Sequence, residues 1–204
     1  MIEYMAELNM QFYSGEDYYS DGTIEDKIYE GIKAGKNCID FSAYEEKEKF
    51  AAFYHLSQIR ENILNWYPFQ KNAELLEIGA GCGAITGLLC RKVMNVTSVE
   101  LSKKRSEINF ERNKKYPNLE IIVGNLNDIT FEKKYDYIVL NGVLEYAMSF
   151  TNTENPYSDF LSNILVNLKE NGVLLIAIEN RLGLKYFNGA VEDHTDNILS
   201  LIHI

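Results

Sequence analysis

The chain has 204 residues, 46% of them hydrophobic and 25% charged, which is the composition of a globular protein with one sizeable core. Its formal net charge of −10 at pH 7 argues against nucleic acid or an anionic lipid surface as a partner, because both bind clustered Lys and Arg side chains. Without a CxxC pair or a run of roughly 18 apolar residues, the sequence predicts no metal site and no membrane span, and it favours a cytoplasmic protein that acts on small molecules or glycans.

Residues 1–43 are acidic and rich in tyrosine, and glycines interrupt any long periodicity. We expect them to form an irregular or partly helical lead segment, followed by a main domain over residues 44–198. In residues 44–66 the apolar side chains recur at spacings near three and four, which is typical of an amphipathic helix. Pro68 lies just beyond and cannot continue that helix.

Beyond Pro68 the pattern changes to short apolar runs separated by helical stretches. The runs are rich in β-branched residues, as parallel strands covered on both faces are, and they comprise 73–78, 95–99, 119–123, 135–140 and 173–178. The helical stretches comprise 84–91, 103–115 and 159–168. Asn171 and Gly172 are expected to stop the last helix before the fifth strand. This alternation predicts an α/β fold with a doubly wound, mostly parallel sheet.

The first predicted strand ends in a glycine-rich turn, LEIGAGCGAIT, with glycines at positions 79, 81 and 83. Glycines at alternate positions permit a tight turn and let the backbone approach a ligand without a collision at Cβ. The helix that follows points free N–H groups at that ligand. Glu100 ends the next predicted strand, where an acid can accept hydrogen bonds from both hydroxyls of a ribose. Together these features predict a nucleoside site.

Glu77 indicates which kind of nucleoside-containing cofactor the site accepts. A dinucleotide-binding turn has the pattern GxGxxG, whereas this chain has ExGxGxG, with an acid on the strand just before the turn. That acid would repel a pyrophosphate but tolerate the ammonium group of a methionine moiety. The spacing therefore favours a sulfonium cofactor, S-adenosyl-L-methionine, over NAD.

The string LEIGAGCG at 76–83 resembles motif I of class I S-adenosylmethionine-dependent methyltransferases, and Glu100 resembles the ribose-binding acid that follows it. The string GNLND at 124–128 is similar to the loop that holds the adenine, although many members carry Asp where this chain has Asn125. The string YDYIVLNGVLEY at 135–146 is similar to the fourth strand and the turn beside the methyl group. The resemblance implies a Rossmann-like core with strand order 3-2-1-4-5. It assigns cofactor binding to Glu77, Gly79, Ala80, Gly81, Gly83, Glu100, Leu101, Asn125, Leu126, Asn141 and Gly142.

A narrower resemblance covers about residues 54–195. The strings YHLS at 54–57, RENI at 60–63, IENRLGLKYF at 178–187 and EDHT at 192–195 are similar to bacterial methyltransferase modules linked to surface-glycan synthesis. Such modules are often fused to glycosyltransferases. This resemblance implies methyl transfer to a hydroxyl of a glycan precursor or another small acceptor, with a glycosyltransferase as a fused or cooperating partner.

The C-terminal end is expected to be truncated, because these modules are longer than this chain and two further strands complete the sheet of the class I fold. Residues 199–204 match the translation of a commonly used transposon sequencing adapter, so we expect them to be non-native and exclude them from the fold. The strand at 173–178 would then be an unprotected sheet edge. A fragment of this kind would bind the cofactor without turning over.

Methyl transfer to a hydroxyl benefits from a general base. His194 is the candidate, because a neighbouring carboxylate could orient its ring. Glu145 and Glu179 follow the fourth and fifth strands, where the acceptor would enter, whereas His55 is interpreted as a packing residue. One basic stretch is interpreted as the solvated face of a helix: Lys103, Lys104 and Arg105.

Two alternatives stay open at this point. A nicotinamide-dependent oxidoreductase would share the fold, but the glycine spacing and Glu77 oppose it. A non-catalytic cofactor-binding or scaffolding module of a glycan-assembly protein would keep the pocket without the reaction.

Overall fold

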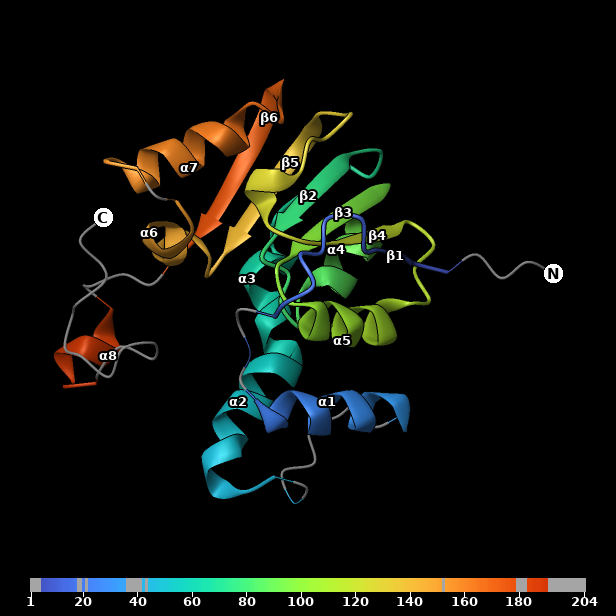
Figure 1. Cartoon of the computed structure of the whole chain (residues 1–204), viewed down its shortest axis with the longest axis vertical. Coiled ribbons are helices and arrows are strands. Elements are labelled where there is room, and N and C mark those ends of the chain that lie inside the picture. The colour runs from blue at the N-terminus through green and yellow to red at the C-terminus, as the bar shows by residue number, and fades with distance from the viewer. Residues whose placement is uncertain are drawn as a thin grey trace.

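The computed structural model describes residues 5–17, 20, 22–35, 42, 44–151, 153–178 and 183–190. These residues form a six-stranded sheet in which every strand pair is parallel, with helices on both faces (Figure 1). The strands are β1 (Glu7–Asn9), β2 (Glu74–Ile78), β3 (Asn95–Glu100), β4 (Leu119–Val123), β5 (Tyr135–Asn141) and β6 (Leu168–Ala177). Their order across the sheet is β1-β4-β3-β2-β5-β6.

The order of β2 to β6 confirms the prediction from the sequence. β2 carries the glycine-rich turn at its carboxyl end and lies between β3 and β5. The chain runs outward from β2 to β4 on one side and then crosses to β5 and β6 on the other. The winding therefore reverses between β2 and β5, which is where doubly wound sheets bind their ligands.

The lead segment differs from its prediction, because it adds a strand to the sheet. β1 pairs with the outer edge of β4, with Leu8 opposite Ile121. The buried Ala6 lies beside this edge, and its N–H donates to the Lys114 carbonyl oxygen at 3.0 Å. Three residues are too few to show a period in the sequence. β1 forms because its backbone pairs with that of β4.

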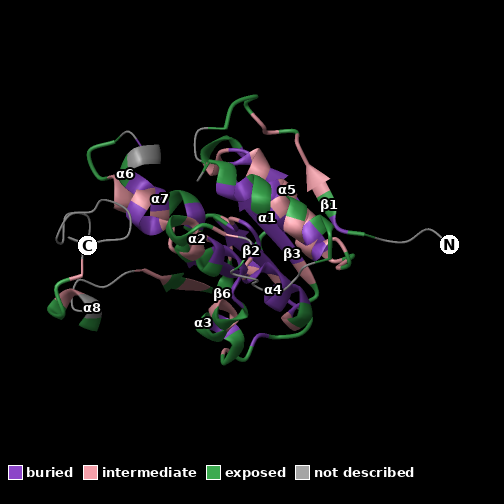
Figure 2. Ribbon diagram, turned by 90° about the horizontal axis from the view of Figure 1, so that it is seen from below, coloured by how far each residue is buried: buried purple, intermediate pink, exposed green. Residues whose placement is uncertain are grey.

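Alternate side chains of the strands form two apolar cores, one on each face of the sheet. Leu75 and Val139 pack toward α3 (Asn62–Asn65) and α4 (Thr86–Lys92). Leu76 and Ile138 pack toward α6 (Ala147–Phe150) and α7 (Pro156–Leu165). Figure 2 shows the buried residues gathered along the central strands and α4. The glycine-rich turn therefore starts from the most enclosed part of the fold.

A third apolar core joins the lead segment to the main domain. It lies between α1 (Thr23–Lys33), α2 (Glu46–Leu56) and α5 (Lys103–Asn113), and it includes Cys82 of the glycine-rich turn. Ile24, Ile28 and Ile32 recur every four residues along α1, so they share the buried face of that helix. Figure 1 shows α1 and α2 beyond the carboxyl ends of the strands. The lead segment thus packs beside the edge where a ligand is expected.

The single helix predicted over residues 44–66 is wrong. α2 ends at Leu56, and a 3-10 turn, η2 (Gln58–Glu61), leads into α3. Ser57 between them is extended, with φ −65° and ψ 126°, and its hydroxyl oxygen accepts the N–H of Ile59 at 3.3 Å. A serine that caps the next turn competes with continuation of the helix. The apolar spacing runs on across this break and conceals it.

Asn171 and Gly172 do not end a helix, contrary to the prediction. α7 begins at Pro156 and ends at Leu165, and both residues lie within β6. The register with β5 changes from Tyr135↔Leu168 to Tyr137↔Val173, so β6 bulges here. β6 therefore begins at Leu168, before the predicted position.

β6 is the outermost strand on its side, and no strand within the described residues pairs with its outer edge. The short helix α8 (Leu184–Phe187) follows it. The predicted adapter-derived tail at 199–204 lies outside the described residues. Across the described ranges, no helix is both long and apolar enough to cross a membrane.

Candidate functional site

A cavity of about 680 Å³ opens at the carboxyl ends of β2, β3, β4 and β5. Its volume lies within the ~300–1,000 Å³ that is typical of small-molecule sites. Residues of α2 and η2 form the wall opposite the sheet. Most of the predicted cofactor residues line it: Glu77, Gly79, Ala80, Gly81, Glu100, Leu101, Asn125, Leu126, Asn141 and Gly142.

Two glycines of the turn after β2 have different tasks. Gly81 has φ +54° and Gly83 has φ +73°, a backbone region that favours glycine. A Cβ on Gly81 would meet no atom within 4 Å, so this position leaves the cavity wall open. Gly83 is the predicted cofactor residue that does not line the cavity. A Cβ there would lie 2.2 Å from Asn109 Oδ1, so Gly83 allows the turn to pack against α5.

Glu77 is buried at the end of β2, with one oxygen paired and one not. Its Oε2 accepts hydrogen bonds from Thr86 Oγ1 at 2.7 Å and from Ser98 Oγ at 2.6 Å. Its Oε1 is buried without a hydrogen-bond partner among the described residues. Burial raises the pKa of Glu77 to about 7, the two hydroxyl hydrogen bonds lower it, and the charge of Glu100 raises it. A buried, unpaired carboxyl oxygen at a cavity fits a cationic ligand group.

Glu100 is buried at the end of β3 and lines the same cavity. Its Oε1 accepts the N–H of Ser102 at 3.0 Å, and its Oε2 accepts the N–H of Gly81 at 2.8 Å. Burial raises the pKa of Glu100, while the Ser102 hydrogen bond and the charge of Arg105 lower it. Each carboxylate oxygen can accept a second hydrogen bond. The backbone therefore orients this carboxylate and leaves capacity for ligand hydroxyls.

Arg60 of η2 lines the cavity, although it was assigned no role from the sequence beyond its place in the string RENI. Its guanidinium lies 3.9 Å from the centroid of the Tyr54 ring, and its Nη1 donates to the Tyr54 carbonyl oxygen at 3.2 Å. The charge of Arg60 lowers the pKa of Glu77. The cavity therefore combines a cation with an acid at one end. Arg60 follows the helix break at Ser57, so apolar periodicity could not place it.

The turn after β5 forms another part of the wall. Asn141 and Gly142 line the cavity together with the buried Glu145 of η4 (Leu144–Tyr146). A Cβ on Gly142 would lie 3.6 Å from Glu145 Oε1 and 3.7 Å from Tyr54 Oη, so these two polar groups converge on the turn. Around them the wall is mostly apolar: Phe50, Phe53, Ile63, Val143, Phe160 and Ile178.

The remaining candidate side chains lie in different settings. His194 and Glu179 lie outside the described residues. His55 is buried, as expected of a packing residue, and it also lines the cavity. Arg105 is not on a solvated face as predicted, because it is buried and its Nε donates to Glu25 Oε1 at 2.7 Å. In the part of the chain that the structure describes, no cluster of His, Cys, Asp and Glu could hold a metal ion.

Comparison with known proteins shows which family the central part of this chain resembles. Residues 76–176 match the family described as methyltransferase domain. The malonyl-[acyl-carrier protein] O-methyltransferase of Priestia megaterium is 27% identical over 139 residues, which cover 67% of this chain and 46% of that protein. The ubiquinone biosynthesis O-methyltransferase of Pelagibacter ubique is 28% identical over 130 residues, which cover 60% of this chain and 51% of that protein. The chain thus spans about half the length of these curated relatives.

A solved structure shows the same fold. The phosphoethanolamine N-methyltransferase 1 of Haemonchus contortus, in complex with phosphoethanolamine and S-adenosylhomocysteine, matches with a TM-score of 0.55 and 21% identity. The match covers 81% of this chain and 35% of that one. Residues 76–176, which are 101 of the 204 residues, are therefore similar to a methyltransferase domain, a class of protein that uses S-adenosyl-L-methionine as its cofactor. Glu77 Oε1, which has no hydrogen-bond partner among the described residues, and the open cavity wall at Gly81 fit S-adenosyl-L-methionine.

Proposed function

We propose that this chain binds S-adenosyl-L-methionine in the cavity and transfers its methyl group to a hydroxyl of a small-molecule acceptor. The proposal rests on one observation. Two buried acids, Glu77 and Glu100, line one cavity at the carboxyl ends of neighbouring strands, and Glu77 Oε1 has no hydrogen-bond partner among the described residues. A nucleoside with a cationic tail matches this pair, because ribose hydroxyls donate hydrogen bonds and an ammonium group carries positive charge.

At the methionine end, Glu77 and Arg60 have opposite charges, which match the ammonium and carboxylate groups of an amino acid. At the nucleoside end, Glu100 accepts hydrogen bonds from the ribose. Asn125 and Leu126 flank the adenine, and the N–H of Asn127 donates to Asn125 Oδ1 at 3.0 Å and so holds that side chain. NAD fits this arrangement less well, because the Glu77 carboxylate would repel a pyrophosphate.

When bound, the cofactor supplies an electrophilic methyl group on a sulfonium. The protein's main contribution is to align the acceptor oxygen with that group, since in-line displacement depends on a near-attack arrangement. Asn141 and Gly142 form the wall beside the reacting centre. We assign to Glu145 the role of the base that takes the hydroxyl proton, because it is a buried carboxyl at this end of the cavity. Tyr54 Oη converges on the same turn and orients the acceptor.

An oxygen acceptor is supported by the names of the two curated relatives, which are both O-methyltransferases. The apolar walls of the cavity favour an acceptor with an apolar or ring-shaped body. Within this class we propose a glycan precursor, on the resemblance of residues 54–57, 60–63 and 178–187 to glycan-linked methyltransferase modules, with a glycosyltransferase as partner. The net charge of −10 argues against RNA or DNA as the substrate.

Two measurements test this function. Calorimetric titration with S-adenosylhomocysteine, S-adenosylmethionine and NAD should show binding of the first two alone. Transfer of a labelled methyl group should then be measured to sugar nucleotides, phenols, a malonyl-loaded carrier protein, phosphoethanolamine and RNA. We expect labelled sugars. Comparable binding of NAD without binding of S-adenosylhomocysteine would overturn the cofactor assignment, and labelling of RNA or of an amine alone would overturn the acceptor.

The same assay tests the assignment of Glu145. Glu145→Gln should lower the rate of transfer to a hydroxyl while leaving the affinity for S-adenosylhomocysteine nearly unchanged, because a general base contributes to chemistry and not to cofactor binding. An unchanged rate would move the base role to a residue outside the described ranges, with His194 as the next variant.

A further inference from the structure

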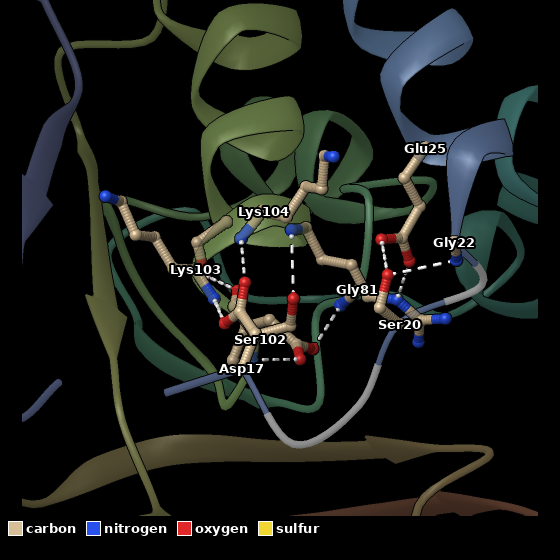
Figure 3. A network of polar contacts seen from close by, with 11 residues as sticks. Asp17, Ser20, Gly22, Glu25, Gly81, Ser102, Lys103 and Lys104 are labelled. Carbon is tan, nitrogen blue, oxygen red and sulfur yellow. Dashed lines mark hydrogen bonds and ion pairs between the residues drawn. The ribbon is translucent and has the colours of Figure 1, made fainter. Parts of the chain in front are cut away.

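The lead segment holds the first turn of α5 at two points (Figure 3). Asp17 Oδ1 accepts the N–H of Lys103 at 2.7 Å, and its Oδ2 accepts the N–H of Lys104 at 3.3 Å. Glu25 of α1 accepts the Nε–H of Arg105 at 2.7 Å. Glu25 is 0% exposed and Arg105 is 8% exposed, so this ion pair is buried, unlike the more exposed Lys104–Asp26 pair between the same two helices.

The same turn of α5 holds the carboxylate of Glu100. The N–H of Ser102 donates to Glu100 Oε1 at 3.0 Å, and Ser102 Oγ accepts the N–H of Arg105 at 3.3 Å. Arg105 lines the same cavity as Glu100, and its charge acts on that carboxyl. A continuous set of polar contacts therefore runs from Glu25 in the lead segment, through Arg105, to the acid at the end of β3.

We propose that Glu25 is a positioning residue for the ribose of the cofactor, because it holds the Arg105 guanidinium at the wall of the cavity that Glu100 also lines and keeps it from covering that carboxylate. The inference rests on the proposed function, which assigns Glu100 to the ribose. Without Glu25, a buried guanidinium beside a carboxylate pairs with that carboxylate and occupies the lone pairs that the ribose hydroxyls need. The lead segment is thereby part of the cofactor site.

Packing alone does not explain this pair. Ile24, Ile28 and Ile32 already fasten α1 to the rest of the fold, and a buried ion pair contributes little net stability once its desolvation is counted. Ser20 Oγ donates to Glu25 Oε2 at 2.6 Å, so both oxygens of the buried acid are fixed in orientation. Such orientation serves a group whose position at the cavity matters.

The test separates positioning from general loosening of α1 by comparing two ligands. The dissociation constants of S-adenosylhomocysteine and of its 2′-deoxy analogue are measured by calorimetry for each protein. In the unmodified chain the analogue should bind about tenfold or more weakly, because it lacks a hydrogen bond to a charged acceptor. In Glu25→Gln this ratio should fall to within about twofold, and S-adenosylhomocysteine should lose most of the difference.

Asp26→Asn is the matched control. Asp26 neighbours Glu25 on α1 and pairs with Lys104 of α5, but it is largely exposed and does not contact Arg105. The same loss of one negative charge should leave the ratio unchanged. If Glu25→Gln does not fold, the charge-neutral double variant Glu25→Gln with Arg105→Gln takes its place. It has no guanidinium to cover Glu100, so it should keep the ratio of the unmodified chain, and a lost ratio in it would overturn the proposal.

Glu100→Ala distinguishes the two ways of being wrong. A wild-type ratio in Glu100→Ala would show that Glu100 does not bind the ribose, and the proposed function would need revision. A ratio that is lost in Glu100→Ala but retained in Glu25→Gln would overturn the positioning role alone. If Glu25→Gln weakens both ligands by the same factor, the Glu25–Arg105 ion pair stabilises the fold without positioning the ribose, and the proposal is likewise overturned.

Discussion

Glu77 and Glu100 are buried carboxyl groups at the ends of neighbouring parallel strands, and the charge of Glu100 contributes to raising the pKa of Glu77. Two acids that share one cavity repel each other when both are ionised. A bound cation offsets that repulsion. The repulsion between the two carboxylates therefore makes the cavity selective for a positively charged ligand.

The unfolding free energy should depend on pH through the titration of Glu77. Its folded-state pKa of about 7 lies above the ordinary value of 4.5, so the folded state holds a proton that the unfolded state releases between these values. The resulting stability is present below about pH 4.5 and lost as pH rises through 7, to a total of roughly 3 kcal/mol. Glu77→Gln stays neutral, so its unfolding free energy relative to the unmodified chain should rise from pH 5 to pH 8. Denaturant titrations at each pH measure this, and a difference that is flat with pH would contradict it.

Binding of the cofactor product should release a proton from the same group. An ammonium beside Glu77 favours the ionised carboxylate, so S-adenosylhomocysteine should displace up to about one proton at pH 6. Calorimetry in buffers with different ionisation enthalpies counts that proton. The release should vanish in Glu77→Gln, and an equal count in both proteins would place the ammonium elsewhere.

Arg60→Gln should weaken ligands that carry a carboxylate. The dissociation constant of S-adenosylhomocysteine should rise by about ten- to a hundredfold, as loss of a charge-assisted hydrogen bond predicts, whereas adenosine should bind as before. Arg91→Gln is the control, because Arg91 pairs with Glu61 and does not line this cavity. A parallel loss of adenosine affinity would indicate that Arg60 supports the fold of η2 and not the methionine end.

Two glycines with similar backbone angles should respond differently to alanine. Gly81 and Gly35 have φ +54° and +75°, and an added Cβ would meet no atom within 4 Å at either one. Each alanine should cost about 1 kcal/mol of stability through backbone strain. Only Gly81→Ala should also weaken S-adenosylhomocysteine, because its Cβ would enter the space of the ligand. Equal affinities in the two variants would place the cofactor away from the turn.

The free edge of β6 should promote self-association. Val173 and Ile176 of this strand are partly exposed, and no described strand pairs with its outer edge. Light scattering should increase with protein concentration, and Ile176→Lys should suppress the increase, since a charge discourages edge pairing. Met94→Lys changes a similarly exposed apolar residue away from β6 and should leave the scattering unchanged. Suppression by both variants would indicate general surface hydrophobicity instead.

Local sequence patterns were sufficient to predict the fold class of this protein and the position of its glycine-rich turn. The alternation of apolar runs and helical stretches predicted a doubly wound parallel sheet, because strand length, β-branching and helical period are properties of short segments. The resemblance of the glycine-rich turn to motif I supplied the order of β2 to β6. The glycine-rich turn and the acids at 77 and 100 could be placed for a related reason. Parallel strands end at one edge of a sheet, so residues at those ends are neighbours whenever the order is right.

The tertiary structure alone decided the rest, because it depends on groups that are distant in the chain. β1 exists through pairing with β4, and Arg60 reaches the cavity only because Ser57 breaks a helix whose apolar spacing continues. Arg105 lies in a basic stretch that looked solvated, yet the buried Glu25, 80 residues earlier, gives it a partner. The charge of a side chain is local, but its burial and its partner are set by the segments that pack over it.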